Sequence, residues 1–329
     1  MNYVDINRQF TTQNTETNLS DANGRAIWAL GYLVAQEAIL PAAFIATAEA
    51  ILERVLPRVE MMHSTRAMAF TIKGLYYYNL DRQSPAVSRI IQTLADRLVQ
   101  MYRHESEVGW LWYESYLTYA NSTLPEALLC AWLDTPKPVY KDIARASFDF
   151  LLSMIFSDDE IRVISNETWL QKGDKPSRHG EQPIDVAYTI LALSQFCEVF
   201  GEQAYGEKMK MAFDWFLGKN SLHQIVYNPC TSGCYDGLEE MHVNLNQGAE
   251  STVSYLMARL TLEAQLTAAT PVQTEWATPQ NDARLIQKQW INDESSGAVY
   301  WRNTQQAAQP DCQADRSWRH PAAKHDRRS

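Results

Sequence analysis

Residues 26–34 read AIWALGYLV and residues 44–59 read FIATAEAILERVLPRV, and the contrast between these two stretches decides the fold. The first stretch is apolar almost all round, which is typical of a helix covered on both sides. The second carries apolar residues at helical spacing on one face, while its other face is polar. Together the two stretches predict an inner helix followed by an outer helix.

The same alternation continues to about residue 266. Further apolar segments lie at 68–72, 127–133, 186–197 and 253–266, and further one-faced segments lie at 87–102, 140–151 and 205–216. Inner helices are expected to begin near Ser20, Ser64, Ser122, Gln182 and Gln247, in steps of 44, 58, 60 and 65 residues. The three serines are expected to act as N-caps.

The lengthening connections between hairpins bear on how the helix pairs are arranged. An open α-solenoid also stacks helix pairs, but its repeats keep a constant period. Here the connections grow and fill with Trp, Tyr, Asn and acidic residues, and loops of that length usually carry function. The sequence therefore favours an all-α toroid of helical hairpins over residues 1–266. Residues 267–329, rich in Gln, Ala, Pro, Asp and Arg, are expected to form a loosely ordered polar tail.

Charge and cysteine content restrict the class of protein further. The 329 residues carry a formal charge of -10, so neither nucleic acid nor an anionic membrane is an expected partner. No secretory signal follows Met1, and five scattered cysteines suit a reducing compartment, so a cytoplasmic location is expected. Cys230 and Cys234 lack a second pair, and no metal or other cofactor is expected.

If all inner helices run in the same direction, the loops before their N-termini meet on one face of the ring. Those loops combine acidic residues with aromatic ones, which is what cleavage of a glycosidic bond requires: a protonated acid, a second carboxylate and rings that hold a sugar. Glu114 is the predicted proton donor, because neighbouring aromatic residues would remove it from water. Asp236 is the predicted base, with Glu181, Asp185 and Glu250 in reserve.

The predicted substrate contacts come from the same loops. They are the polar or aromatic residues Asp21, Arg25, Arg66, Trp112, Tyr113, Tyr119, Asn121, His179, Gln182, Tyr235, Asn246 and Gln247. Structural explanations stay open for several of them. Acidic residues in a first helical turn also favour the helix dipole, which explains Asp21, Asp185 and Glu250 without catalysis. Arg25 and Arg66 are equally suited to bridging carboxylates across the floor of the ring.

Five motifs, in order along residues 7–266, resemble a bacterial family of the six-hairpin glycosidase superfamily. They are DANGRAIWALG at 21–31, TYANSTLPEAL at 118–128, EQPID at 181–185, CYDGL at 234–238 and NQGAEST at 246–252. The resemblance implies an (α/α)6 toroid that acts in carbohydrate metabolism. Members are often labelled glycosyltransferases, because the domain is fused to, or encoded beside, sugar transferases. Such relatives usually begin with another hairpin whose motif is absent here, which implies about five of six hairpins.

Three functions are compatible with these observations. The first is a glycoside hydrolase that acts on a neutral oligosaccharide. The second is a non-catalytic glycan-binding or accessory domain that serves a glycosyltransferase partner. The third is a sugar epimerase of similar shape, whose chemistry generally requires a pair of histidines, for which His179 and His242 are the candidates.

Overall fold

Inner and outer helices alternate along the chain in the computed structural model, which describes residues 3–157, 159–177, 179–269, 290–293 and 298–301. The inner helices are α2 (Ser20–Val34), α4 (Thr65–Arg82), α6 (Thr123–Asp134), α8 (Pro183–Phe200) and α10 (Ala249–Ala269). The outer helices are α3 (Ala42–Val59), α5 (Pro85–Glu105), α7 (Pro138–Ile155) and α9 (Gln203–Asp214). A short helix, α1 (Gln13–Glu16), precedes them, and a 3-10 turn, η1 (Trp215–Leu217), follows α9.

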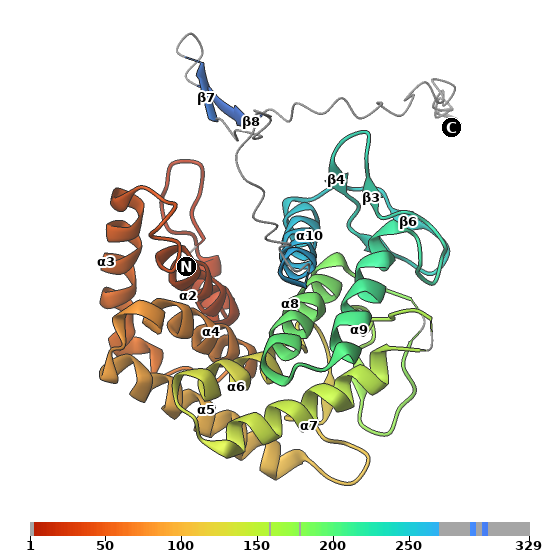
Figure 1. Cartoon of the computed structure of the whole chain (residues 1–329), viewed down its shortest axis with the longest axis horizontal. Coiled ribbons are helices and arrows are strands. Elements are labelled where there is room, and N and C mark those ends of the chain that lie inside the picture. Colours follow the sequence, from red (N-terminus) through yellow and green to blue (C-terminus); the bar gives the residue numbers. More distant parts are fainter. Residues whose placement is uncertain (1–2, 158, 178, 270–289, 294–297, 302–329) are drawn as a thin grey trace, which may run out of the picture. The chain divides into compact units, whose positions relative to one another are not determined.

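The predicted toroid of helical hairpins is confirmed. Each inner helix packs against the next, from α2 through α4, α6 and α8 to α10, and each outer helix packs on the inner helix before it. Figure 1 shows α3, α5, α7 and α9 outside the inner row. Inner helices α4, α6 and α8 are buried around most of their circumference, whereas α5 buries one stripe, as the hydrophobic pattern predicted.

The described part of the first unit contains four hairpins, α2/α3, α4/α5, α6/α7 and α8/α9, followed by α10 as a single inner helix. The outer helix that would complete the expected fifth hairpin with α10 would follow Ala269, largely outside the described residues. Figure 1 shows the helices as an arc that ends in α2 and α10. Arg25 of α2 and Glu250 of α10 approach each other to 3.8 Å across these ends.

The predicted N-caps are confirmed in one case of three. The Ser64 hydroxyl accepts a hydrogen bond from the Ala67 amide at 3.4 Å and caps α4. Ser20 is wrong as a cap, because the helix already includes it and Leu19 precedes α2 without a side-chain cap. Ser122 occupies the cap position of α6, but its hydroxyl hydrogen-bonds the Thr189 hydroxyl on α8 at 2.7 Å instead.

Helices α2 and α4 pack backbone to backbone at three glycines. A Cβ atom on Gly31 would lie 1.9 Å from the Gly74 carbonyl oxygen, and one on Gly74 would lie 2.5 Å from the Ile27 carbonyl oxygen. At Gly24 it would lie 2.7 Å from the Ala67 carbonyl oxygen. Only glycine permits this approach, and it holds the first turns of α2 and α4 side by side.

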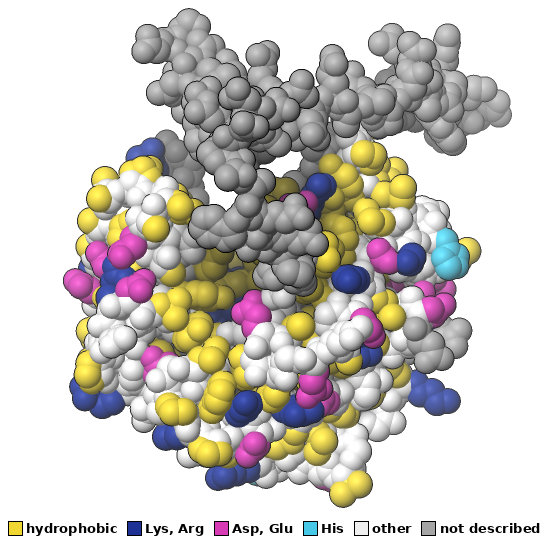
Figure 2. Space-filling model, in the orientation of Figure 1, with side chains coloured by type: hydrophobic (Ala, Val, Ile, Leu, Met, Phe, Trp, Pro, Cys, Tyr) yellow, Lys and Arg dark blue, Asp and Glu magenta, His cyan; other side chains and the backbone are white. Residues whose placement is uncertain are grey.

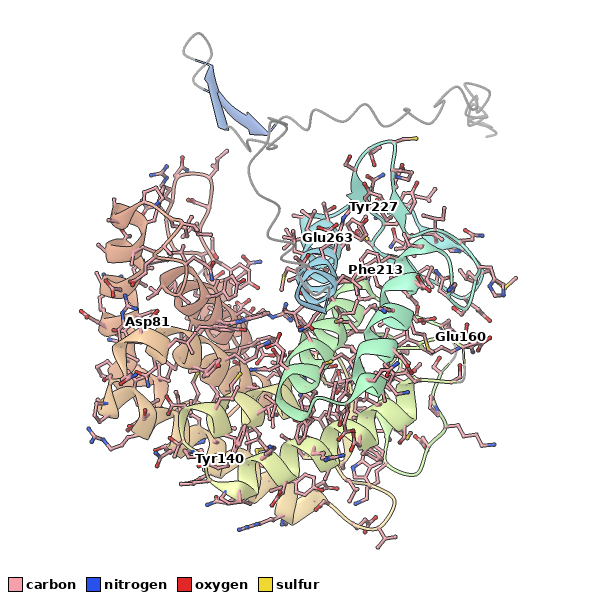
Figure 3. All side chains as sticks on the ribbon, in the orientation of Figure 1. Asp81, Tyr140, Glu160, Phe213, Tyr227 and Glu263 are labelled. Carbon is pink, nitrogen blue, oxygen red and sulfur yellow. The ribbon has the colours of Figure 1, made fainter. Side chains whose placement is uncertain are left out.

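Short strand pairs stiffen the long loops that precede inner helices. In antiparallel pairs, β1 (Tyr116–Leu117) faces β2 (Leu170–Gln171), β3 (Tyr227–Asn228) faces β4 (Gly233–Cys234), and β5 (Gly237–Leu238) faces β6 (Val243–Asn244). The loop containing β3 is anchored on α10, because Tyr227 stacks on Tyr255 with ring centroids 4.1 Å apart. Phe213 of α9 contacts Tyr255 as well. Figure 3 labels Tyr227 and Phe213.

The chain divides into two compact units, Met1–Thr270 and Pro271–Ser329. In the second unit, β7 (Trp290–Asp293) pairs antiparallel with β8 (Ala298–Trp301). The rest of the predicted polar tail at 267–329 lies largely outside the described residues, so its loose order stays a prediction. In the first unit, α8 is apolar and long enough to match a membrane span by composition, and 61% of it is buried inside the fold, as expected of a core helix.

Candidate functional site

The first turns of the inner helices meet through polar side chains. Asp21, in the first turn of α2, accepts hydrogen bonds from the Ser64 hydroxyl at 2.7 Å and from the Tyr119 hydroxyl. Asp21 therefore connects α2 to the cap of α4 and to the loop before α6. The loops before α2, α4 and α6 therefore meet on one face, as predicted for them.

Arg66, in the first turn of α4, occupies the centre of this network. Its guanidinium contacts both oxygens of Glu114, at 3.2 and 2.9 Å, and donates to the Tyr119 carbonyl oxygen at 2.8 Å. It also reaches the Asn121 side-chain oxygen at 3.4 Å. Thr65 donates to Glu114 as well. Arg66 thus bridges carboxylate and loop, the structural alternative that the sequence had left open.

Asp185, in the first turn of α8, has a different environment from Glu114. One oxygen, Oδ1, accepts the Ala120 amide at 2.6 Å, and Ala120 adopts a left-handed backbone conformation, with φ of 50°, that is uncommon outside glycine. The other oxygen, Oδ2, is buried and has no hydrogen-bond partner in the described structure. Burial raises the pKa of Asp185 to about 7, against the opposing influence of Arg66 and Arg25.

A buried aromatic cluster and a second charged pair adjoin Asp185. Phe70 and Tyr188 are buried and in edge-to-face contact, with centroids 5.7 Å apart, and the Arg25 guanidinium lies 5.0 Å from the Phe70 centroid. Arg25 also pairs with Glu250, whose side chain is 63% exposed and whose charge contributes to the raised pKa of Asp185. Asp185 is 6% exposed, so the two carboxyl groups have opposite access to water.

A cavity of about 340 Å³ lies between the first turns of α8 and α10. Its lining comprises Asn166, Gly180, Glu181, Gln182, Asp236, Gly237, Leu238, Glu239, Asn244, Gly248, Ala249, Glu250 and Ser251. Glu250 belongs to this lining and also pairs with Arg25, so the cavity adjoins the Arg25–Asp185 cluster. Four carboxylates and three carboxamides line it, which suits a ligand with many hydroxyl groups.

Two of the predicted catalytic carboxylates in this cavity are held by the protein itself. Asp236 accepts the Gly248 amide at 2.9 Å and the Ser251 hydroxyl at 2.7 Å, both on Oδ1, so these two bonds join it to the start of α10. Glu181 accepts the Trp215 indole N–H at 2.8 Å and the Ser221 hydroxyl at 2.7 Å. Burial raises the pKa of Glu181, and the two hydrogen bonds oppose that shift.

Trp112 and Tyr113 correct the sequence interpretation. Both were predicted to contact substrate, but both are fully buried in the main hydrophobic core. The Tyr113 hydroxyl hydrogen-bonds Ser147 at 2.9 Å, so the Tyr113 side chain packs against the outer helix α7. The loop that carries Glu114 is therefore fixed to the core by its aromatic residues, and these are not available to a sugar.

The remaining predicted contacts lie on the surrounding loops. The Gln247 side chain accepts from the Thr231 hydroxyl at 2.6 Å, the Tyr235 hydroxyl accepts from Asn228 at 2.8 Å, and Asn246 is exposed. His179 lies 3.3 Å from Glu167, whereas His242 lies on the turn between β5 and β6. Within the described part of the chain, no group of three or more His, Cys, Asp or Glu residues is arranged to hold a metal ion.

Several residues of the site were missing from the sequence prediction. Thr65 contributes a hydrogen bond to Glu114, and Asn166 contributes to the cavity wall. Phe70 and Tyr188 form the buried aromatic cluster. Phe70 and Tyr188 lie within apolar helices, and their sequence context is that of core residues. Asn166 lies in the loop between α7 and α8, where the sequence has no helical pattern. Its amide donates to the Gly180 carbonyl oxygen at 2.9 Å, and this contact with a distant residue holds it at the cavity.

No protein-family model matches this chain, and no curated protein matches it by sequence. Solved structures do match its fold. An unsaturated glucuronyl hydrolase specific for heparin aligns with a TM-score of 0.59 at 14% identity, over 80% of this chain and 71% of that chain. A sugar epimerase from a ruminal bacterium aligns with a TM-score of 0.57 at 11% identity, over 82% of this chain and 77% of that one. The chain therefore shares the (α/α) toroid fold of these enzymes.

Proposed function

We propose that this protein is a carbohydrate-active enzyme, a glycoside hydrolase, that uses Asp185 as proton donor and Glu250 as the second carboxylate. The observation that carries the proposal is the Asp185 carboxyl group, buried with one oxygen unpaired and with a pKa raised to about 7. A carboxyl group that keeps its proton near neutral pH is what a glycosidic leaving oxygen requires. The shared fold with a hydrolase and an epimerase of sugars supports the same class.

Asp185 fits the role of proton donor better than Glu114. Glu114 has both oxygens in contact with Arg66 and one with Thr65. A proton on Glu114 would weaken its ion pair with Arg66. A proton on Asp185 removes a buried charge and turns the unpaired oxygen into a hydrogen-bond donor. Asp236, the base favoured by the sequence, has its Oδ1 held by the Gly248 amide and the Ser251 hydroxyl at the start of α10.

Glu250 fits the second role because it lies near Asp185 and faces water. Glu250 lines the cavity and is largely exposed. The positive charge of Arg25 interacts with both carboxyl groups, because Arg25 pairs with Glu250 and lowers the pKa of Asp185. In hydrolysis, Asp185 gives its proton to the leaving oxygen as the glycosidic C–O bond breaks. Glu250 accepts a proton from the water whose oxygen bonds to the sugar carbon.

The first prediction is that Asp185→Asn and Glu250→Gln each lower turnover of an oligosaccharide by about a hundredfold or more, as expected when an acid or a base is removed. The matched control is Glu263→Gln, an exposed carboxylate on the same helix as Glu250 that pairs with Arg259 at 2.8 Å. Its turnover should equal that of the wild type. The assay is release of reducing sugar from a panel of neutral oligosaccharides.

Two results would count against the hydrolase. Wild-type turnover retained by both Asp185→Asn and Glu250→Gln would remove these residues from the chemistry. Binding of an oligosaccharide without any turnover by the wild type would favour the glycan-binding accessory module instead.

A further inference from the structure

Trp169 is an exposed aromatic residue on the loop between α7 and α8. It is 45% exposed, and its backbone is left-handed, with φ of 51°, which is a strained conformation for a bulky side chain. One face of its indole stacks on the Tyr116 ring, with centroids 5.6 Å apart and planes 23° apart. The side chain is therefore held flat against a second ring while much of it remains in water.

The backbone around Trp169 is locked in place. The Ser165 hydroxyl accepts the amides of Glu167 and Thr168, and the Ser165 carbonyl accepts the Trp169 amide at 3.3 Å. The next residue, Leu170, is buried and pairs with Leu117 in the β1–β2 ladder. The indole is thus preorganised, and a ligand that contacts it need not order the loop.

Both partners of the stack are connected to the candidate site. The Tyr116 hydroxyl interacts with Glu114, which belongs to the Arg66 network. The turn that carries Trp169 also contributes Asn166 to the wall of the cavity, beside Glu181. The exposed ring is therefore joined to the candidate site on two sides, through Tyr116 and through its own turn.

We propose that Trp169, supported from behind by Tyr116, is a stacking platform for a pyranose ring of a bound oligosaccharide, outside the sugars held near Asp185 and Glu250. The C–H groups on one face of a pyranose are apolar and carry partial positive charge, which suits the electron-rich face of an indole. The platform deepens the proposed function, on which it rests for the identity of its ligand. It implies a substrate longer than the part that reacts.

The experiment measures binding of cello-, manno- and malto-oligosaccharides, from disaccharide to hexasaccharide, by calorimetry. Wild type, Trp169→Ala and the control Tyr32→Ala are compared, each also in an Asp185→Asn background that removes turnover. Tyr32 is 50% exposed and packs edge-on against Tyr77 with centroids 5.0 Å apart, but it lies in the C-terminal half of α2, whose first turn carries Asp21. Tyr32 therefore serves as the control, because it is also an exposed aromatic residue packed against a second ring.

Affinity of the wild type should rise with chain length and then level off. Trp169→Ala should remove that rise, with a loss on the order of tenfold for the longer sugars and little change for the shortest. Tyr32→Ala should bind like the wild type.

An undiminished rise with length in Trp169→Ala would overturn the platform and leave the catalytic proposal intact. Release of reducing sugar by Asp185→Asn is assayed on the same oligosaccharides. Turnover equal to the wild type in that assay, with the length effect still lost in Trp169→Ala, would overturn the catalytic proposal alone. No binding of any sugar by the wild type would overturn both.

Discussion

At the scale of single residues, Lys73 is a buried charge outside the candidate site. Its ammonium group is completely buried, pairs with Glu126 at 2.7 Å and lies 3.9 Å from the centroid of the Trp28 ring. Burial raises the pKa of Glu126, and Lys73 opposes that shift. A pair of this kind gains little net stability over an apolar pair, but breaking it leaves one buried charge without compensation.

Lys73→Met should therefore lower the free energy of unfolding by about 3–5 kcal/mol, because Glu126 is left alone in the core. The double variant Lys73→Met/Glu126→Leu should recover most of that loss. Urea unfolding of Lys73→Met, Glu126→Leu and the double variant measures both effects. Additive losses in the double variant would show that the two side chains are not energetically coupled.

Residue roles were only partly predictable from the sequence, and Glu114 shows why. Its aromatic neighbours suggested a carboxyl group removed from water, but Trp112 and Tyr113 turn into the core, and Arg66 meets Glu114 from 48 residues away. Such a distant ion pair leaves no local pattern. Asp185 was a candidate with an equally good explanation from the helix dipole. Its unpaired oxygen and the strained Ala120 that contacts it exist only once the loops are folded.

At the scale of elements, glycines bring the backbones of α2 and α4 into direct contact. Gly31→Ala would place a methyl group 1.9 Å from the Gly74 carbonyl oxygen, so the helices must separate. We expect a loss of unfolding free energy of more than about 3 kcal/mol, or failure to fold. The control Gly206→Ala adds a methyl group 3.7 Å from the Cys197 sulfur, in ordinary contact, within α9.

Gly206→Ala should raise the unfolding free energy by about 0.5–1 kcal/mol, because alanine loses less backbone entropy in a helix. Thermal unfolding followed by circular dichroism compares the two variants. Equal stability of Gly31→Ala and the wild type would mean that α2 and α4 are farther apart than described.

The helices were predictable because each carries its own periodicity over many residues. The starts of α4, α6 and α8 fall within one residue of the expected positions, and the one-faced pattern of α5 identified its buried stripe. The strand pairs were not predictable, because two-residue ladders such as β1–β2 depend on a partner more than 50 residues away and carry no alternation of their own.

At the scale of the first unit, the candidate site joins the two ends of the arc. Arg25 comes from α2, Asp185 from α8 and Glu250 from α10, so the proposed acid, the arginine beside it and the proposed second carboxylate lie on three different inner helices. On the face shown in Figure 2, lysine and arginine side chains are interspersed with acidic ones and form no basic patch. This distribution and the net charge of -10 suit a neutral ligand better than a polyanion.

The protonation of Asp185 couples the site to the stability of the whole molecule. Its pKa is raised from 3.8 to about 7 on folding. Between these values the unfolded chain ionises Asp185 while the folded protein keeps the proton, so the folded state binds more protons and loses stability as the pH rises. Above about pH 7 the loss is complete. Asparagine at this position has no proton to lose and retains an oxygen for the Ala120 amide.

The most direct test is the free energy of unfolding of the wild type and of Asp185→Asn, measured by urea at a series of pH values from about 4 to about 8. The advantage of Asp185→Asn over the wild type is predicted to grow with pH, by up to about 4 kcal/mol, and to level off above about pH 7. A difference that stays constant over this range would mean that Asp185 is already ionised in the folded protein and has no proton to give.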